Sequence, residues 1–157
     1  MLHLDVRSIG KPTEHWQNDA LMMYQHRIQS LAKLNTTTYA CPKRSRQHQL
    51  SSLVEKEREM LFRDLPVGSY RIILDERGKH FDTLGLMRHL LDKQRDYSHL
   101  VFLLGGPDGH HHSTRNDAHL VLSLSHFTLP HMFAKIILYE QLYRCLTLMT
   151  NHPYHRE

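Results

Sequence analysis

The two most continuous apolar segments constrain the fold of this chain more than any other feature of its sequence. Residues 70–75 (YRIILD) and 99–104 (HLVFLL) are both of strand length and rich in isoleucine, leucine and aromatic side chains. Such runs are typical of strands that are buried on both faces of a parallel sheet. Between them, residues 83–95 have the period of a helix, with Thr83 as the expected N-cap residue. Two strands joined through a helix predict an α/β fold with a mostly parallel sheet flanked by helices.

Shorter segments continue the alternation of strands and helices. We expect strands at residues 2–9, 36–41 and 120–124, the first of them half-buried because polar and apolar residues alternate along it. Helices are expected from residue 13 or 14, over residues 50–65 and over residues 132–150. The first of these helices is expected to bury one broad face with Trp16, Ala20, Met23, Tyr24, Ile28 and Leu31. This pattern predicts a single domain over residues 1–157.

Composition excludes several classes of protein. The two cysteines, Cys41 and Cys145, form no CxxC pair, which argues against a redox motif or a zinc ribbon and favours the cytoplasm. No apolar run reaches the length of a membrane span, and residues 1–11 do not have the apolar core of a signal peptide. We therefore expect no membrane partner. The net charge of +4 agrees with a phosphate-rich partner but does not require one.

Two polar segments have competing interpretations. His110, His111 and His112 resemble a metal site, but three consecutive histidines on a turn cannot all reach one ion, and no second ligand pair surrounds them. We expect no physiological metal there. Residues 42–49 (PKRSRQHQ) are basic and without period. They are predicted to form either a solvated connection or a loop that contacts RNA.

Two segments follow predicted strands directly and are candidate ligand loops. Ligands of open parallel sheets bind at the carboxyl ends of the strands, where glycines let the backbone approach closely. Residues 105–109 (GGPDG) fit this role, although they also favour an ordinary turn and match neither GxGxxG nor a P-loop. Residues 123–130 (SLSHFTLP) predict either an ordinary connection or an adenine pocket lined by backbone groups.

The helix predicted at residues 132–150 is apolar around most of its circumference. A helix of this kind is buried on more than one side, so we expect one side in the domain core and another in the interface of a homodimer. A polar stripe of Glu140, Arg144, Thr147 and Asn151 interrupts it, with Glu140 and Arg144 spaced for an ion pair. The stripe points toward residues 152–157 (HPYHRE), which are either a frayed end or a functional group of side chains.

Taken together, GGPDG, SHFTLP, EQLYR and TNHPYHRE resemble the RlmH family, the ribosomal RNA large-subunit pseudouridine N3-methyltransferases of the SPOUT superfamily. The similarity is clear over residues 70–157. It implies a SPOUT-type α/β trefoil knot in the C-terminal half, S-adenosylmethionine as cofactor, and a homodimer that acts on ribosomal RNA in the large subunit or the whole ribosome. It also implies that the cofactor is held at Leu74, Gly106, Ser125, His126, Phe127, Thr128, Leu129 and Pro130. His110, His111 and His112 depart from the small or apolar residues usual after the family's glycine motif.

The implied reaction sets the roles of the remaining candidates. N3 of a pseudouridine is weakly acidic, so the enzyme has to orient it and help it lose a proton. His155 is the candidate base or proton relay, Tyr154 orients that base or the RNA, and Arg144 binds a phosphate or stabilises the developing charge. The second subunit and the ribosome's own surface are expected to complete the site, because a monomer of this size has no RNA-binding appendage.

Two classes of function compete with this hypothesis. One is a knotted ribosome- or RNA-binding protein without catalytic activity, and the other is a metal-handling protein that uses the fifteen histidines. Binding of S-adenosylmethionine or of a metal ion separates them. The sequence leaves open which nucleotide is modified and whether free RNA or only assembled ribosomes are substrates. It also leaves open the identity of the general base and the role of the histidine run.

Overall fold

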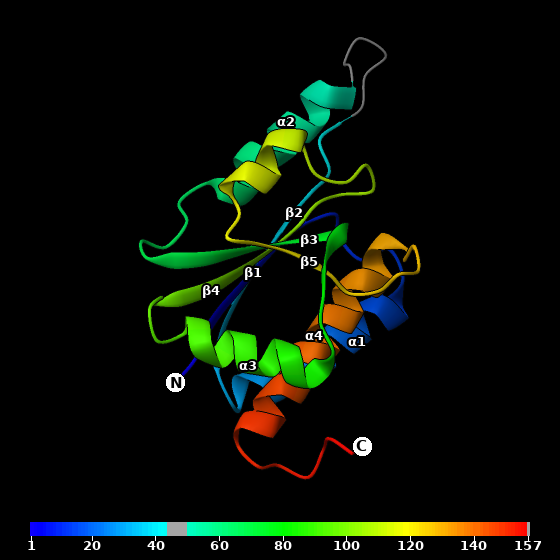
Figure 1. Ribbon diagram of the computed structural model, residues 1–157. Helices are drawn as coiled ribbons and strands as arrows, with labels where there is room; N and C mark the ends of the chain where they lie inside the picture. The colour runs from blue at the N-terminus through cyan, green and yellow to red at the C-terminus, as the bar shows by residue number, and fades with distance from the viewer. Residues whose placement is uncertain (44–49, 157) are drawn as a thin grey trace.

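A parallel sheet forms the centre of the computed structural model, which describes residues 1–43 and 50–156 (Figure 1). Most of the loop predicted at residues 42–49 therefore lies outside the described residues. The strand order is β2-β1-β4-β3-β5, and each neighbouring pair is parallel. The strands are β1 (His3–Ile9), β2 (Lys33–Tyr39), β3 (Ser69–His80), β4 (His99–Leu104) and β5 (Leu120–Ser123). The predicted α/β fold with a mostly parallel sheet is confirmed.

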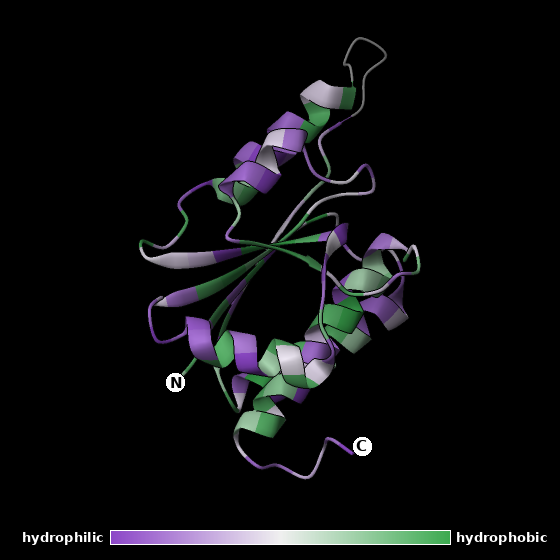
Figure 2. Ribbon diagram, in the orientation of Figure 1, coloured by the Kyte–Doolittle hydropathy of each residue, from purple (hydrophilic) through white to green (hydrophobic). Residues whose placement is uncertain are grey.

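Helices cover both faces of this sheet. Figure 1 shows α2 and the short 3-10 helix η1 on one side, and α1, α3 and α4 on the other. Their bounds are α1 (His15–Gln29), α2 (Leu50–Phe62), α3 (Thr83–Lys93), η1 (His112–Asp117) and α4 (His131–Met149). In Figure 2 the central strands and much of α4 are hydrophobic, whereas α2 is mostly hydrophilic. The larger core therefore lies between the sheet and the three-helix layer.

Strand β4 has apolar side chains on both faces, as its sequence predicts. Leu100 and Phe102 belong to the core beneath α1, α3 and α4, while Val101 and Leu103 pack on the α2 side. All four side chains are fully buried. The prediction of a strand buried on both faces is confirmed, with the bounds that the apolar run indicates.

Strand β1 is not half-buried, and that expectation is wrong. It lies between β2 and β4, so both of its faces are covered. Its polar residues form a buried ion pair: the guanidinium of Arg7 lies 3.2 Å from the carboxylate of Asp5 and also donates to the carbonyls of Leu61 and Asp64. The charges compensate each other, which allows a central strand to have an alternating sequence.

Several predicted boundaries also change. Strand β2 covers residues 33–39 rather than 36–41, and β3 continues five residues beyond Asp75 to pair again with β5 after a shift in register. Thr83 is not the N-cap of α3; the carboxylate of Asp82 accepts from the N–H of Gly85 at 2.6 Å, and the Thr83 hydroxyl donates to Gln141 instead.

The first and last helices pack against each other differently from the prediction. In α1 the buried side chains are Leu21 and Ile28, whereas Trp16 and Met23, expected on the buried face, are 49% and 42% exposed. Helix α4 contacts both α1 and α3, so most of its apolar circumference is covered within one chain. Phe133 remains 46% exposed. In the described part of the chain, no helix is both long and apolar enough to cross a membrane.

Candidate active site

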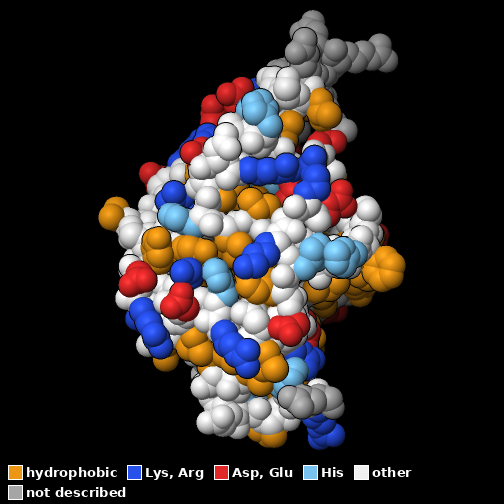
Figure 3. Space-filling model, in the orientation of Figure 1, with side chains coloured by type: hydrophobic (Ala, Val, Ile, Leu, Met, Phe, Trp, Pro, Cys, Tyr) orange, Lys and Arg blue, Asp and Glu red, His pale blue; other side chains and the backbone are white. Residues whose placement is uncertain are grey.

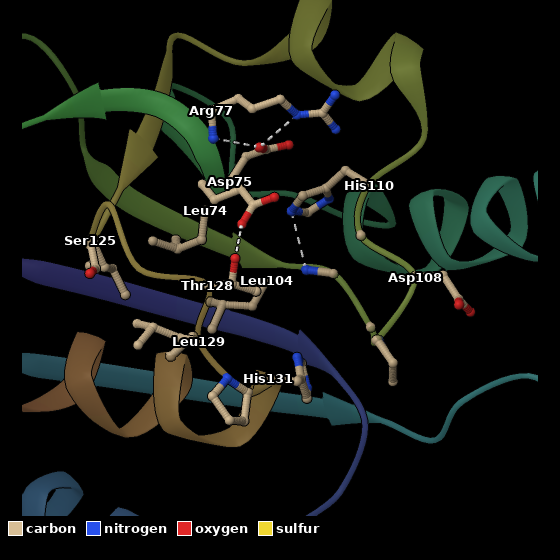
Figure 4. Close-up of a pocket in the computed structure, with 18 of the residues that line it drawn as sticks. Leu74, Asp75, Arg77, Leu104, Asp108, His110, Ser125, Thr128, Leu129 and His131 are labelled. Atoms are coloured by element: carbon tan, nitrogen blue, oxygen red, sulfur yellow. Dashed lines mark hydrogen bonds and ion pairs between the residues drawn. The ribbon is translucent and has the colours of Figure 1, made fainter.

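A cavity of about 500 Å³ opens at the carboxyl ends of β4 and β5, beside the part of β3 where the register with β5 shifts (Figure 4). Its walls are residues 74–77 of β3 and the segments at residues 104–110 and 124–131, and Ala134 of α4 adds to the last of them. Loops far apart in the sequence meet here because parallel strands end at the same edge of the sheet. The volume suits a ligand of the size of a nucleoside cofactor.

The glycine loop after β4 has little room for a side chain at positions 105 and 106. The N–H of Gly109 donates to the carbonyl of Gly106 at 3.0 Å, and Gly109 has a φ of +77°, which favours glycine. A Cβ on Gly105 would lie 2.9 Å from the carbonyl oxygen of Gly109. A Cβ on Gly106 would lie 3.0 Å from the Glu57 carboxylate and 3.2 Å from Ile9. The loop is thus packed tightly from behind and presents its backbone to the cavity.

Acidic side chains lie on the β3 side of the cavity. The carboxylate of Asp75 accepts from the guanidinium of Arg115 at 2.8 Å and from the N–H of Arg77 at 2.9 Å. Burial acts to raise the pKa of Asp75, but these hydrogen bonds outweigh it and the pKa is lowered. Asp75 is therefore a carboxylate at neutral pH. Glu76 accepts a hydrogen bond from Thr128 at 3.3 Å, which ties two walls together (Figure 4).

The third wall is held by its own serines. The hydroxyl of Ser123 donates to the carbonyl of Ser125, and the hydroxyl of Ser125 accepts from the N–H of Phe127 at 2.9 Å. Phe127 is 81% exposed at the rim. Of the predicted cofactor residues, those that line the cavity are Leu74, Gly106, Ser125, Phe127, Thr128, Leu129 and Pro130. His126 does not line it and stacks on His80 instead, with the ring centroids 3.7 Å apart.

Sequence reasoning missed two histidines and two acids in this cavity. His110 turns back into it and accepts from the N–H of Gly105 at 3.2 Å (Figure 4), and burial lowers its pKa. His131 lies on the opposite wall, where burial also lowers its pKa. Asp75 is the last residue of the strand predicted at residues 70–75, and Glu76 follows it. Their position at the end of a buried strand is the sequence feature that could have indicated a place in the site. The described residues contain no group of three or more His, Cys, Asp or Glu side chains able to hold a metal ion.

The candidate catalytic residues form a second cluster, at the other end of α4. Arg144 and Glu140 make the predicted ion pair at 2.7 Å. The hydroxyl of Tyr154 donates to Glu140 at 3.3 Å, and the guanidinium of Arg144 lies 4.8 Å from the centre of the Tyr154 ring. A nitrogen of Arg144 lies 3.4 Å from Nδ1 of His155. The structure thus brings Arg144, Tyr154 and His155 together.

The end of α4 explains why the following segment folds back onto the helix. Asn151 has a φ of +55°, and the N–H of His152 donates to the carbonyl of Thr147 at 2.8 Å. This pattern is a Schellman motif, which reverses the chain direction at a helix end. Burial, the largest cause, raises the pKa of Tyr154 to about 12, so its hydroxyl is a hydrogen-bond donor at neutral pH.

The cavity and the cluster of candidate catalytic residues are far apart within one chain. His131 and Ala134 line the cavity at the start of α4, whereas Arg144 is ten residues beyond Ala134 on the same helix. At ~1.5 Å of rise per residue, roughly 15–20 Å of helix separates the two groups. The contacts of Tyr154 and His155 with α4 hold residues 152–156 at the end of this helix that is farther from the cavity. The two groups cannot serve one reaction within a single subunit in this arrangement.

The chain matches known proteins along nearly its whole length. Residues 2–155 match a family described as "Predicted SPOUT methyltransferase". A Thioalkalivibrio sulfidiphilus protein named Ribosomal RNA large subunit methyltransferase H is 34% identical over 156 residues, which cover 99% of this chain and 100% of that protein. Proteins of the same name from Coxiella burnetii and Neisseria meningitidis serogroup C are 34% and 30% identical, with the same coverage. The match to the family includes both the cavity and the cluster at the far end of α4.

Proposed function

This chain belongs to the SPOUT methyltransferase family, and we propose that it transfers a methyl group from S-adenosylmethionine to N3 of a pseudouridine in 23S ribosomal RNA. Its full-length similarity to proteins named Ribosomal RNA large subunit methyltransferase H is the observation that carries this proposal. The trefoil knot, the cytoplasmic location and the action on assembled ribosomes belong to the same proposal. The cavity at the strand ends supports it independently.

The residues of this cavity fit S-adenosylmethionine. Leu74, Leu129 and the glycine loop offer apolar and backbone surface to an adenosine. Glu76 places a carboxylate beside a cationic ligand, whereas the charge of Asp75 is compensated by Arg115 and Arg77. The bound cofactor would supply an electrophilic methyl group. The protein's part is to hold it in one orientation and keep it away from water.

The cluster on α4 supplies the groups for proton transfer. His155 is the base or proton relay that accepts the N3 proton, because it brings an imidazole to the cluster, 3.4 Å from a nitrogen of Arg144. Tyr154 remains protonated and orients the base or the RNA. Arg144, already oriented by Glu140 at 2.7 Å, binds a phosphate or the negative charge that develops on the imide.

A homodimer resolves the separation of the two groups. The cofactor cavity of one subunit would face the Arg144, Tyr154 and His155 cluster of the partner. An exposed apolar face supports such an interface: Trp16 packs on Phe133 with ring centroids 5.3 Å apart, and Met23 is exposed on the same face of α1, seven residues after Trp16. The interface that we propose thus includes the start of α4 and the side of α1 that carries Trp16 and Met23.

Sedimentation tests the interface. We expect a dimer at low micromolar concentration, since obligate interfaces of this type bury ~2,000 Å² or more. Phe133→Glu should give a folded monomer, because this side chain is exposed in the single chain and a charge there affects only the interface. Val67→Glu is the matched control, at a residue 96% exposed at the far end of the sheet from the cavity, and it should remain dimeric. A stable wild-type monomer would contradict the proposal.

The function itself is tested in cells and in solution. Mass spectrometry of ribosomal RNA from cells that lack this protein should show one unmethylated pseudouridine in the large-subunit RNA, and the gene should restore it. The purified protein should methylate assembled ribosomes more efficiently than naked 23S RNA, because we expect the ribosome's own surface to help complete the site. Calorimetry should detect micromolar S-adenosylmethionine binding. A fully methylated RNA in the deletion strain excludes the proposed substrate.

A further inference from the structure

A second cavity, of about 510 Å³, lies beside the cofactor cavity. It is enclosed by the loop before α1, the end of β2, one turn of α4 and a side of α1 that does not carry Trp16 or Met23. Its lining includes Lys11, Glu14, His15, Met22, Thr38 and Lys135. Because His131 and Ala134 line the cofactor cavity and Lys135 is the next residue of α4, the two cavities flank the same helical turn. A ligand in the second cavity would therefore lie next to a bound cofactor.

Lys135 is the unusual residue of this second cavity. Its side chain is only 2% exposed, and its ammonium group donates to the hydroxyl of Thr38 at 3.2 Å. Among the described residues, no carboxylate lies within ion-pair distance of it. Burial lowers its pKa to about 8. A buried ammonium without a counter-ion is unfavourable for folding, so this lysine is not explained by stability alone.

The surroundings of Lys135 favour an anion. Helix α1 begins at the cavity with Glu14 as its N-cap, and a capping box with Gln17 uses one N–H group of its first turn. The positive end of the helix dipole lies at this edge. Lys11 adds a second cation on the loop before the helix. The charged and titratable groups at this place are therefore Lys11, Lys135, His15 and His131, opposed by Glu14. The one carboxylate of the lining does not balance the two lysines.

We propose that the second cavity binds a backbone phosphate of the RNA substrate, held by Lys135, Lys11 and the start of α1. This inference rests on the proposed function and adds a phosphate subsite to it. Figure 3 shows Lys and Arg side chains dispersed among acidic and apolar groups on the face that it presents, without one continuous basic patch. On such a surface, individually placed cations have to fix the register of the RNA.

Lys135→Met tests the subsite, with Lys33→Met as the matched control. Methionine keeps the length and packing of the buried stem and removes the charge, while Lys33 is an exposed lysine at the opposite end of β2 from Thr38. We expect Lys135→Met to weaken binding of a short single-stranded oligouridylate ~10-fold or more. The slope of log affinity against log salt should fall by roughly 0.7–1, the contribution of one phosphate contact. Lys33→Met should change neither quantity, and Lys135→Arg should restore part of the affinity.

Further measurements test whether Lys135→Met acts through RNA binding or through the stability of the fold or the cofactor site. Melting temperature and S-adenosylmethionine affinity should remain unchanged in Lys135→Met, and removal of the buried charge should not destabilise the fold. Lys11→Met, at an exposed loop residue, provides a second test that does not depend on the folding of the first variant. Inorganic phosphate should raise the pKa of Lys135 measured by NMR, but should compete with the oligouridylate only at millimolar concentration.

The outcomes are distinguishable from a failure of the proposed function. A wild-type salt slope in both Lys135→Met and Lys11→Met overturns the subsite, even if the enzyme methylates ribosomes. Protection of Lys135 from amine-reactive reagents by dimer formation alone, without RNA, would show that the partner subunit fills the cavity, and this result also overturns it. If wild-type protein fails to methylate ribosomal RNA but still binds the oligouridylate through Lys135, the subsite stands and the proposed reaction is wrong.

Discussion

Gly106→Val is expected to abolish S-adenosylmethionine binding while leaving a folded protein. The first added carbon would lie 3.0 Å from the Glu57 carboxylate and 3.2 Å from Ile9, so it does not enter the cavity but meets the wall behind the loop. Because Glu57 and Ile9 are buried, they cannot move aside easily, and the loop itself has to shift into the cavity. Calorimetric titration should find no binding at cofactor concentrations ~100-fold above the wild-type dissociation constant.

Two further variants separate binding from stability. Gly106→Ala, with one added carbon, should weaken binding less than valine does. Gly68→Val is the control: its φ of +72° makes any side chain unfavourable, but it lies at the turn before β3, far from the cavity. This control should lower the melting temperature and leave the affinity unchanged. Wild-type affinity in Gly106→Val would remove the proposed cofactor site.

The strands could be predicted where the sequence forms an uninterrupted apolar run. Strand β4 has its predicted bounds because the run from His99 to Leu104 is followed at once by glycine. The extension of β3 to His80 could not be predicted, since residues 76–80 are polar and pair with β5 only after a change of register. Nor does an alternating pattern reveal that Asp5 and Arg7 neutralise each other inside the sheet.

The candidate site could be predicted in its parts but not in its arrangement. The glycine loop and residues 123–130 line one cavity because parallel strands end at one edge, a rule that needs only the strand positions. The i, i+4 spacing likewise predicted the Glu140–Arg144 pair. The sequence does not reveal that His126 stacks on His80 and does not line the cavity. The separation of the cavity from the Arg144, Tyr154 and His155 cluster could not be predicted. It follows from the position of α4, whose first turn lines the cavity and whose last turns carry the cluster.

Deletion of residues 152–157 is expected to reduce methyl transfer by at least ~100-fold, the lower end of general acid–base effects. The dimer and the S-adenosylmethionine affinity should remain nearly intact, because Tyr154 packs on the edge of the core against Tyr143, at the end of α4 that is farther from the cofactor cavity. His155→Ala alone should lose much of the activity and change its pH dependence. His152→Ala is the matched control in the same exposed turn and should remain active. A truncated enzyme with the wild-type rate would exclude these residues from catalysis.

A mixing experiment then tests whether the site is shared between subunits. Subunits that carry Gly106→Val lack a cofactor site but retain the catalytic cluster, and subunits truncated at residue 151 have the reverse defect. Each homodimer should be inactive. If the cavity of one subunit meets the cluster of the other, a heterodimer contains one site with both defects and one site with none. It should therefore regain about half the activity of the wild-type dimer, since one of its two sites is intact. Sites formed within single chains would give no recovery, because every chain in the mixture carries a defect.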